Sequence, residues 1–333
     1  MNPVLQTPST TTAAPTMLFA PLASDLEQVE RILAATLDSP RPHVREMVTH
    51  LNHYRGKRLR PMLLLLTAHA CGGVRPVHHV LGAVVEMIHT ATLVHDDVLD
   101  EASVRRHVAT VNACWGNQTS ILLGDYLFTQ SFYLASTVDA RACRIIGAAT
   151  NRVCEGELQQ VGERGNLRLS EEEYLAIIDG KTAELTSCCC RLGAIYSDAA
   201  DEVVENLANF GRWLGMAFQI ADDLLDLIGE ERTTGKSLGT DLDQRKLTLP
   251  LIHALEQTPA DIANRIRHIL DTPGNHKRQT LVPYLEASAA LSYARQRAEQ
   301  FAQQARDELK CLPPSHFRDI LETLTERVVH REK

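Results

Sequence analysis

The stretch VLGAVVEMIHTATLVHDDVLDEASVRR, residues 80–106, decides how the chain folds. Up to Val94 it is apolar nearly all round, interrupted only by Glu86 and His89, and it lacks the period of two that marks a half-buried strand. An evenly apolar helix of this kind is typical of a protein core. The run then ends in the acidic sequence DDVLD, so we predict a buried helix over residues 80–100 with three carboxylates at its end.

The rest of the chain carries helical periodicity from about Leu22 to its end, and we expect an all-α fold without a sheet. Pro61 stands in the first turn of one helix, where its missing N–H costs little, and Ser170 with Glu173 forms a capping-box pattern for another. The expected helices lie at residues 22–37, 44–54, 60–71, 80–100, 119–136, 141–161, 181–196, 201–228 and 317–329. Because no linker or change of composition divides them, residues 17–333 are predicted to form a single all-α domain.

The composition argues against several classes of protein. With 34 basic and 42 acidic residues among 333, the net charge is −8, which argues against a nucleic-acid binder. The apolar run at residues 80–94 is too short and too polar for a membrane span. Residues 1–16 hold five Thr, three Pro and no charged side chain, so we expect a disordered tail rather than a targeting signal. The eight cysteines form no CxxC pair and indicate reduced thiols in a cytoplasm; the consecutive Cys188, Cys189 and Cys190 are interpreted as packing residues.

Two acidic motifs of one pattern, DDVLD at residues 96–100 and DDLLD at residues 222–226, each end an apolar helix. Residues four apart project from one helix face at about 6 Å, so Asp96 and Asp100 repel each other and need a cation to offset them. Carboxylate oxygens with open positions are ligands of Mg²⁺, which also takes phosphate oxygens. Two such clusters facing each other across a bundle predict a diphosphate held by bridging magnesium ions. General acid–base catalysis is the competing interpretation, although it does not need six aspartates.

A diphosphate site also needs permanent positive charge. The segment GKRLRP, residues 56–61, supplies three cations within four residues, beside a helix start whose dipole favours anions. The further candidates along the chain are Arg105, Arg106, Lys181, Lys236 and Lys246.

Together these motifs resemble those of the trans-polyprenyl diphosphate synthases, the head-to-tail elongators of isoprenoid chains. The resemblance is strong from Leu51 to Leu255 and rests on the ordered set GKRLRP, EMIHTATLVHDDVLDEASVRR, GDYLF, KTAEL, FQIADDLLDL, GKSLGTDL and KLTLPL. It implies a single large helical bundle around a deep central cavity, of the isoprenoid synthase type, and a homodimer. It also implies magnesium-dependent condensation of isopentenyl diphosphate with an allylic prenyl diphosphate.

The resemblance assigns metal and catalytic roles one residue at a time. Asp96 and Asp100 match ligands of two Mg²⁺ ions and Asp222 matches the ligand of another, which implies about three ions per site. Supporting or water-mediated contacts to the metals are implied for Asp97, Asp223 and Asp226. The residues that match the catalytic region, where the allylic cation forms, are Lys181, Thr182 and Gln219.

The resemblance also implies two sets of diphosphate-binding residues. Those that match the clamp for isopentenyl diphosphate are Lys57, Arg60, His89 and Arg106. Those that match the grip on the allylic diphosphate are Arg105, Lys181 and Lys236, with Lys246 assisting at the mouth of the site. Residues 229–245 match a segment that closes and excludes water. The sequence departs from the family at His107, where Gly usually follows the paired arginines, and we expect this residue either to shift them or to demand a different turn.

The length of the product is predicted from the residues one turn before Asp96. Ala91 and Thr92 are both small, whereas short-chain members of the family carry an aromatic residue near here. The helix from Val80 to Asp96 spans roughly 24 Å at ~1.5 Å per residue, so we expect a long tail, roughly C30–C50 with C40 as the central value. The candidates for the floor of its tunnel are Phe128, Phe132 and Tyr133.

Three alternatives stay open beside a long-chain synthase. One is a short-chain synthase (C15–C20). A terpene cyclase shares the helical fold and one acidic motif, but it takes no second diphosphate substrate and so does not need GKRLRP and His89. A regulatory subunit of a heteromeric synthase commonly lacks metal aspartates, whereas all six are present here.

Overall fold

The computed structural model describes residues 18–54, 56–229, 238–272, 274 and 276–330, and in this part of the chain the fold is all-α, as predicted. Three features expected from the sequence lie wholly or partly outside the described residues. They are the tail at residues 1–16, Lys236, and residues 230–237 of the closing segment.

The first half of the described chain contains η1 (Ala20–Leu22), α2 (Ala23–Thr36), α3 (Pro42–Leu51), η2 (Asn52–Tyr54), α4 (Leu59–Ala70), α5 (Pro76–Leu99), β1 (Val104–Arg105), β2 (Val108–Ala109), α6 (Val111–Trp115), α7 (Asn117–Ser136) and α8 (Ala140–Gly162). The second half contains α9 (Glu171–Ile178), the π-helical turn η3 (Asp179–Ala183), α10 (Glu184–Ile195), α11 (Asp201–Ile228), α13 (Thr240–Asp243), α14 (Leu249–Gln257), α15 (Ala260–Asp271), α16 (Lys277–Ala287), α17 (Ala290–Glu308), η4 (Leu309–Cys311) and α18 (His316–Val329).

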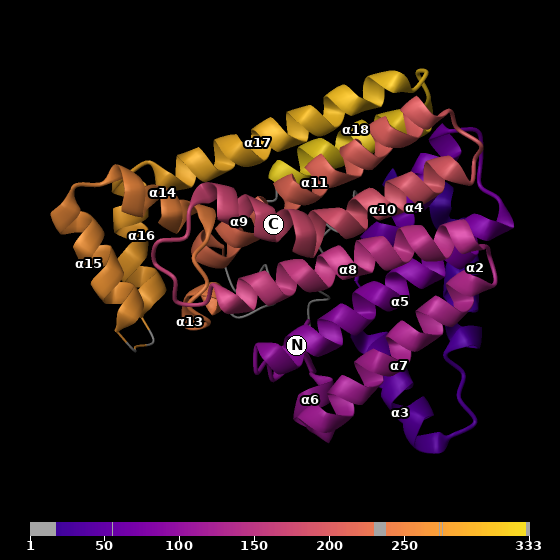
Figure 1. The fold of residues 1–333 in the computed structure, drawn as a ribbon, viewed down its shortest axis with the longest axis horizontal. Helices are drawn as coiled ribbons and strands as arrows, with labels where there is room; N and C mark the ends of the chain where they lie inside the picture. Colours follow the sequence, from indigo (N-terminus) through magenta and orange to yellow (C-terminus); the bar gives the residue numbers. More distant parts are fainter. Residues whose placement is uncertain (1–17, 55, 230–237, 273, 275, 331–333) are drawn as a thin grey trace, which may run out of the picture.

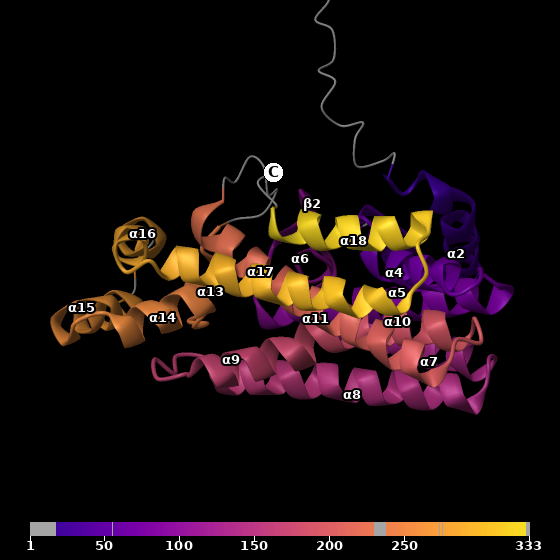
Figure 2. The ribbon, with the colours of Figure 1, turned by 90° about the horizontal axis from the view of Figure 1, so that it is seen from above.

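The long helices form a bundle, with shorter helices at its two ends. In Figures 1 and 2, α14, α15 and α16 lie at one end of the molecule and α2 lies at the other. The long helices α5, α8, α10, α11 and α17 run between these ends. The apolar run that decides the fold is therefore at the centre of the bundle, and both acidic motifs lie at helix ends.

Helix α5 begins four residues earlier than predicted. Pro76 occupies its first turn, and the backbone N–H of Arg75 donates to Nδ1 of His78 over 2.8 Å. By length and composition α5 is the one helix among the described residues that is apolar enough to cross a membrane, but 61% of its most apolar window is buried inside the fold. Burial of this kind is also found in the core helix of a soluble protein.

Helices α10 and α11 approach closely because two glycines face α10. A β-carbon on Gly211 would stand 2.5 Å from the carbonyl oxygen of Thr186, and one on Gly215 would stand 2.6 Å from the α-carbon of Ala183. The three consecutive cysteines of α10 are all buried in the same core, as their interpretation as packing residues predicts. This contact fixes the π-helical turn that immediately precedes α10.

The prediction that the chain has no sheet is wrong at one short hairpin. Val104 pairs with Ala109 and Arg105 with Val108, in antiparallel register. Arg106 and His107 form the two-residue turn, and both have positive φ values, 51° and 65°. Two successive left-handed residues match the turn type that two-residue hairpins favour. His107 takes a left-handed conformation that Gly adopts more easily.

Candidate active site

Two of the three carboxylates in the first acidic motif, at the end of α5, lie in different electrostatic settings. Asp100 accepts from Arg164 over 2.9 Å and pairs with Lys246 over 3.4 Å. Burial raises the pKa of Asp96 to about 6; Lys181 lowers it, while Glu157 and Asp100 raise it further. Among the described residues no side chain donates a hydrogen bond to Asp96. Asp96 is therefore a buried carboxylate whose oxygens are open to a ligand.

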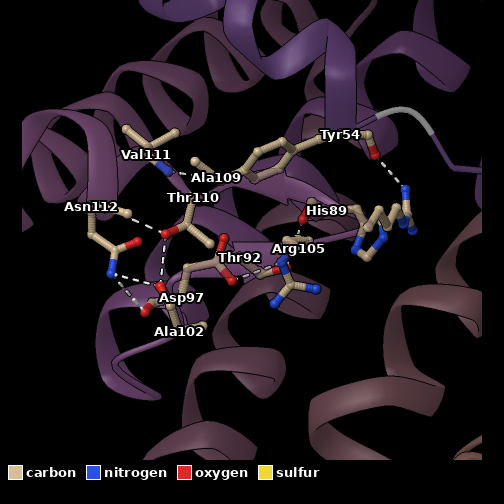
Figure 3. Close-up of polar contacts among 12 residues, drawn as sticks. Tyr54, His89, Thr92, Asp97, Ala102, Arg105, Ala109, Thr110, Val111 and Asn112 are labelled. Atoms are coloured by element: carbon tan, nitrogen blue, oxygen red, sulfur yellow. Dashed lines mark hydrogen bonds and ion pairs between the residues drawn. The ribbon is translucent and has the colours of Figure 1, made fainter. Parts of the chain in front are cut away.

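Asp97, the second aspartate of the first motif, is buried and already paired with an arginine. Its side chain is 1% exposed, and Oδ1 accepts from Nε of Arg105 over 2.7 Å. Figure 3 shows this pair beside Asn112, whose amide donates to the carbonyl oxygens of Asp97 and Ala102. Arg105, which the resemblance assigns to the allylic diphosphate, is thus engaged with Asp97 in this structure. These contacts suit Asp97 to a supporting role in the first acidic motif.

A cluster of positive charge lies next to the first motif, around the buried carboxylate of Glu86. The guanidinium of Arg106 packs against Gly56 and donates to the carbonyl oxygen of Tyr54, which brings the hairpin turn onto the GKRLRP segment. Burial lowers the pKa of His89 well below 6.5, and the positive charges of Arg60 and Arg106 lower it further, so the imidazole is neutral.

Arg60 lies in the same cluster and keeps an unused donor. Its Nε is buried and has no hydrogen-bond partner among the described residues. Burial lowers the pKa of Arg60, and Arg106 lowers it too, while Glu86 and Asp96 act in the opposite direction. Buried donors that converge without a partner suit an anionic ligand. The structure thus brings together Arg60, His89 and Arg106 of the predicted clamp, with Lys57 at the start of the same segment.

Lys181 projects from the π-helical turn η3 and reaches α8. Its Nζ pairs with Glu157 and donates to Oε1 of Gln160 over 2.7 Å. Burial alone would lower the pKa of Lys181, but the carboxylates of Asp96 and Glu157 outweigh it and raise that pKa. Turns of this π type often occur at functional sites. Lys181 is therefore a buried, firmly protonated ammonium held beside Asp96.

The π-helical turn is anchored by ion pairs on its outer side. The Asp179 carboxylate receives two bonds from Arg212, of 2.5 and 2.6 Å, and one of 2.9 Å from Arg152. On the inner side of the turn, Thr182 donates to Oε1 of Gln219 over 2.8 Å. The two predicted polar residues therefore lie together, at the level of the second acidic motif.

The second acidic motif ends α11, and two of its aspartates are used for support. Asp223 is buried and accepts from Tyr174 over 2.6 Å and from the amide of Gln219 over 2.7 Å. Asp226 accepts from the backbone N–H groups of Gly239 and Asp241 over 3.1 and 3.2 Å. Asp226 therefore caps the start of α13 and ties the motif to the segment that follows residue 237. Asp222 is the member of this motif that the resemblance matches to a metal ligand.

The two acidic motifs share their cations. Burial and Asp226 raise the pKa of Asp241 to about 7; Lys246 and Lys181 lower it, and Asp222 raises it. Lys246 also pairs with Asp100, and Lys181 lies beside Asp96. The same two lysines thus act on carboxylates of α5 and on Asp241 of α13, which lies beside Asp222 and Asp226 of the second motif, as expected for two rims of a common site.

Sequence reasoning missed five residues of this site: Glu157, Gln160, Arg164, Tyr174 and Asp241. Asp241 lies in the GKSLGTDL segment, two residues after the left-handed Gly239. The glycine in this segment indicates a turn, which could have pointed to Asp241 as a residue of the site. Glu157 and Gln160 on α8, Tyr174 on α9 and Arg164 in the turn after α8 reach the motifs only through tertiary packing.

The donor set fits a divalent cation that shares its ligands with a phosphate. Among the described residues no group of three or more His, Cys, Asp or Glu side chains can hold a metal ion by itself. Mg²⁺ is usually held by one or two carboxylates together with phosphate oxygens and water. Asp96, Asp100 and Asp222 supply hard oxygens in this way, and the neighbouring lysines and arginines suit the phosphates.

The residues proposed to govern chain length lie on α5 and α7. Ala91 is buried, and the Thr92 hydroxyl donates to the carbonyl oxygen of His89 over 2.8 Å. Phe128 is half-buried, with its ring 5.8 Å from that of His95. Phe132 and Tyr133 are 37% and 70% exposed, so α7 turns them outward in the single chain. Of the three aromatic residues, Phe128 is the one packed against the core.

Known proteins resemble this chain over nearly its whole length. Residues 41–286 match the sequence profile of the family described as polyprenyl synthetase. The chain is 34% identical over 313 residues to the octaprenyl diphosphate synthase of Escherichia coli (strain K12), which covers 93% of this chain and 97% of that protein.

Two solved structures share the fold. A decaprenyl diphosphate synthase from Rhodobacter capsulatus has a TM-score of 0.88 and 37% identity, covering 95% of this chain and 99% of that one. A polyprenyl synthase from Caulobacter crescentus CB15, complexed with calcium and isoprenyl diphosphate, has a TM-score of 0.90 and 32% identity, covering 98% of this chain and all of that one. With facing acidic motifs, a cation cluster and these relatives, the chain belongs to the polyprenyl synthetase family of prenyltransferases, the enzymes that elongate prenyl chains.

Proposed function

We propose that this protein condenses isopentenyl diphosphate with an allylic prenyl diphosphate, in a magnesium-dependent reaction, to give a long-chain all-trans polyprenyl diphosphate. The observation that carries this proposal is that Lys181 and Lys246 lie beside Asp96 and Asp100 and also act on Asp241, next to Asp222, while a second cluster of cations lies nearby. Two anionic substrates need two such sets of positive charge.

The residues of the acidic rims bind and orient the allylic substrate. Asp96, Asp100 and Asp222 would hold Mg²⁺, which when bound supplies Lewis-acid stabilisation of the charge that develops on the departing diphosphate. Lys181 and Lys246 contribute fixed positive charge to the same leaving group.

The other cluster orients the second substrate. Arg60, Arg106 and neutral His89, with Lys57, bind the diphosphate of isopentenyl diphosphate, so that its double bond lies next to the allylic carbon. As the allylic C–O bond breaks, that double bond attacks the cation and a proton leaves to the released diphosphate. Thr182 and Gln219 face this region from η3 and α11.

The absence of an aromatic residue one turn before Asp96 favours a long product. Ala91 and Thr92 occupy that turn and are small, so a growing tail can pass between α5 and its neighbours. Relatives named for octaprenyl and decaprenyl products support a range of roughly C30–C50. The alternative is a short-chain product, and chromatography of the products distinguishes it from a long-chain product.

The test is elongation assayed with isopentenyl diphosphate, an allylic primer and Mg²⁺. The wild type should make a long-chain product, and Asp96→Ala or Asp222→Ala should abolish it while the circular dichroism spectrum stays that of the wild type. Chelation with EDTA should stop the wild-type reaction, and added Mg²⁺ should restore it. Near-wild-type turnover by either variant, or turnover that EDTA leaves unchanged, would defeat the assignment.

We also propose that two copies of the chain pair through α7 and α8. Six large apolar side chains are exposed on these neighbouring helices: Ile121, Leu122, Phe132, Tyr133, Leu158 and Val161. Both views of the ribbon show α8 on one face of the bundle with α7 beside it. An exposed patch of this kind marks an interface, and a two-fold axis lets one patch cover its own copy. Light scattering should give a dimer, and Leu122→Asp with Leu158→Asp should give a monomer.

A further inference from the structure

Arg58 lies in the middle of the GKRLRP segment, and its guanidinium is held between two carboxylates from other helices. Nε donates to Oε1 of Glu30 on α2 over 2.6 Å, and Nη2 donates to Oε2 of the same residue over 3.3 Å. Nη1 donates to Oε1 of Glu86 on α5 over 2.6 Å. The guanidinium therefore bridges α2 and α5 at the point where α4 begins.

The backbone of Arg58 is left-handed, with φ 52° and ψ 38°, and Arg58 is the N-cap residue of α4. Residues with a β-carbon adopt this conformation only at a cost, which surrounding contacts must offset. Lys57 immediately precedes Arg58, and Arg60 follows it within the first turn of α4. The ion pairs of Arg58 thus hold the turn from which α4 carries Arg60 into the cluster with His89 and Arg106.

Arg58 and Arg60 play different parts although both are arginines of the same segment. Each of the three donor nitrogens of Arg58 faces a carboxylate oxygen in the structure, whereas Nε of Arg60 has no partner among the described residues. A guanidinium engaged on two sides by carboxylates is not available to a phosphate. Arg58 is therefore built for support and Arg60 for binding.

Glu86 has a second effect on the same cluster. It is 5% exposed, and its negative charge acts on Arg60 and Arg106 as well as on Arg58. Oε2 of Glu86 is buried and has no hydrogen-bond partner among the described residues. Like charges that converge without a substrate repel one another, and one buried carboxylate among them reduces that repulsion. The clamp can then exist in its binding arrangement before the diphosphate arrives.

We infer that Arg58, held by Glu30 and Glu86, is a positioning residue that preorganises the site for isopentenyl diphosphate. This inference rests on the proposed function, because it assigns Arg60 and its neighbours to that substrate. It extends the site to α2, a helix that contributes no residue to the predicted clamp. Because the allylic substrate is held by the acidic rims instead, the effect is specific to one of the two substrates.

The experiment compares steady-state constants for the two substrates in Arg58→Lys and Glu30→Gln. Lysine keeps the charge but cannot make the forked contacts to both carboxylates. KM for isopentenyl diphosphate should rise about tenfold in either variant, while KM for the allylic primer and kcat stay within about twofold, since only one substrate is misplaced. Arg58→Gly keeps the left-handed backbone without strain and should show the same split, which separates the side chain from the turn.

Arg191→Lys is the matched control, because Arg191 on α10 also makes a forked pair with one carboxylate, that of Glu205 on α11, and neither residue belongs to the clamp. It should leave both KM values unchanged. Thermal unfolding identifies any variant that fails to fold. If Arg58→Lys does not fold, Glu30→Gln, which changes the carboxylate partner and leaves Arg58 in place, provides the test. Calorimetric binding of isopentenyl diphosphate alone is then measured for the same variant. Equal changes in both KM values, or no change, in variants that fold would overturn the inference. A wild type that does not elongate primers would overturn the proposed function instead.

Discussion

The backbone nitrogen of Lys181 occupies the space that a β-carbon on Gly156 would need. Such a β-carbon would also stand 2.9 Å from the carbonyl carbon of Gly180 and 3.1 Å from the carbonyl oxygen of Ile177. Helix α8 therefore rests directly on the π-helical turn. Because of this contact, Glu157 and Gln160, on the following turn of α8, reach the ammonium group of Lys181.

Gly156→Ala should displace the turn that carries Lys181. Overpacking of this kind costs about 1–3 kcal/mol of stability, and the shift of Lys181 should lower elongation more than the small loss of stability explains. Urea unfolding and turnover measure the two effects. Gly147→Ala on the same helix is the control, because nothing lies within 4 Å of its new β-carbon. That variant should gain about 0.5–1 kcal/mol, and equal effects at both positions would contradict the prediction.

Phe128→Ala should lengthen the product. Phe128 packs against the core and comes from α7, which lies along α5, so removing its ring opens space along the proposed path of the tail. Phe132→Ala removes a ring that is 37% exposed and should leave the product length unchanged in the single-chain geometry. Reversed-phase chromatography of dephosphorylated products distinguishes the two. A longer product from Phe132→Ala alone would show that the partner subunit closes the tunnel there.

His107→Gly should stabilise the hairpin. His107 holds a φ of 65°, where glycine adopts the same backbone without steric cost. We expect a gain of about 0.5–1 kcal/mol, because the relief of left-handed strain exceeds the added entropy of glycine in the unfolded chain. His268→Gly, in the ordinary helical backbone of α15, should lose stability in the same urea titration. A loss in both variants would mean that the His107 side chain contributes more than its backbone costs.

Asp25 on α2 should stabilise the fold in a pH-dependent way. It accepts from Nε2 of His79 over 2.8 Å and of His69 over 2.9 Å. Burial on its own would raise the pKa of Asp25, but the hydrogen bonds from the two histidines outweigh it and hold that pKa below 3.8. A lowered carboxyl pKa stabilises the folded state above the unfolded-state pKa, and this stabilisation is lost as pH falls through the folded-state value.

Asp25→Asn should therefore lower the free energy of unfolding by about 1–2 kcal/mol near neutral pH. The difference from the wild type should begin to shrink as the pH falls below the unfolded-state pKa, and it should disappear below the lowered folded-state pKa, where the folded wild-type carboxyl is itself protonated. Urea titrations at a series of pH values check this. A difference that stays constant down to the acid limit would show that the carboxylate charge is not the cause.

Long amphipathic helices could be predicted from the sequence because one apolar stripe and its flanking turns determine them. The helix Asp201–Ile228 was predicted with the bounds that the structure has. The π-helical turn at residues 179–183 carries no such signal, since it depends on arginines of α8 and α11 that meet Asp179 only in the folded protein. The hairpin was missed because it is two residues long on each side, too short to establish a period of two.

The candidate site was predictable where the sequence repeats a pattern. The two acidic motifs can be recognised in the sequence because they share one spacing. The cation cluster at residues 56–61 can be recognised because three basic residues occur within four positions. The role of each aspartate within a motif could not be predicted from the sequence pattern. Asp97 and Asp223 accept hydrogen bonds from Arg105 and Tyr174, and these contacts form only when the hairpin and α9 pack against the two motifs.

The ion pair between Glu30 and Arg58 also bears on where the enzyme can be cut. The segment matched by the family profile begins at residue 41, whereas Glu30 and Asp25 both lie on α2, before that point. A recombinant fragment trimmed to the matched segment would retain every lysine, arginine and aspartate assigned to substrate or metal. It would nevertheless lose the carboxylate that fixes the turn at Arg58, so homology-guided trimming would impair the enzyme without removing any group that touches a reactant.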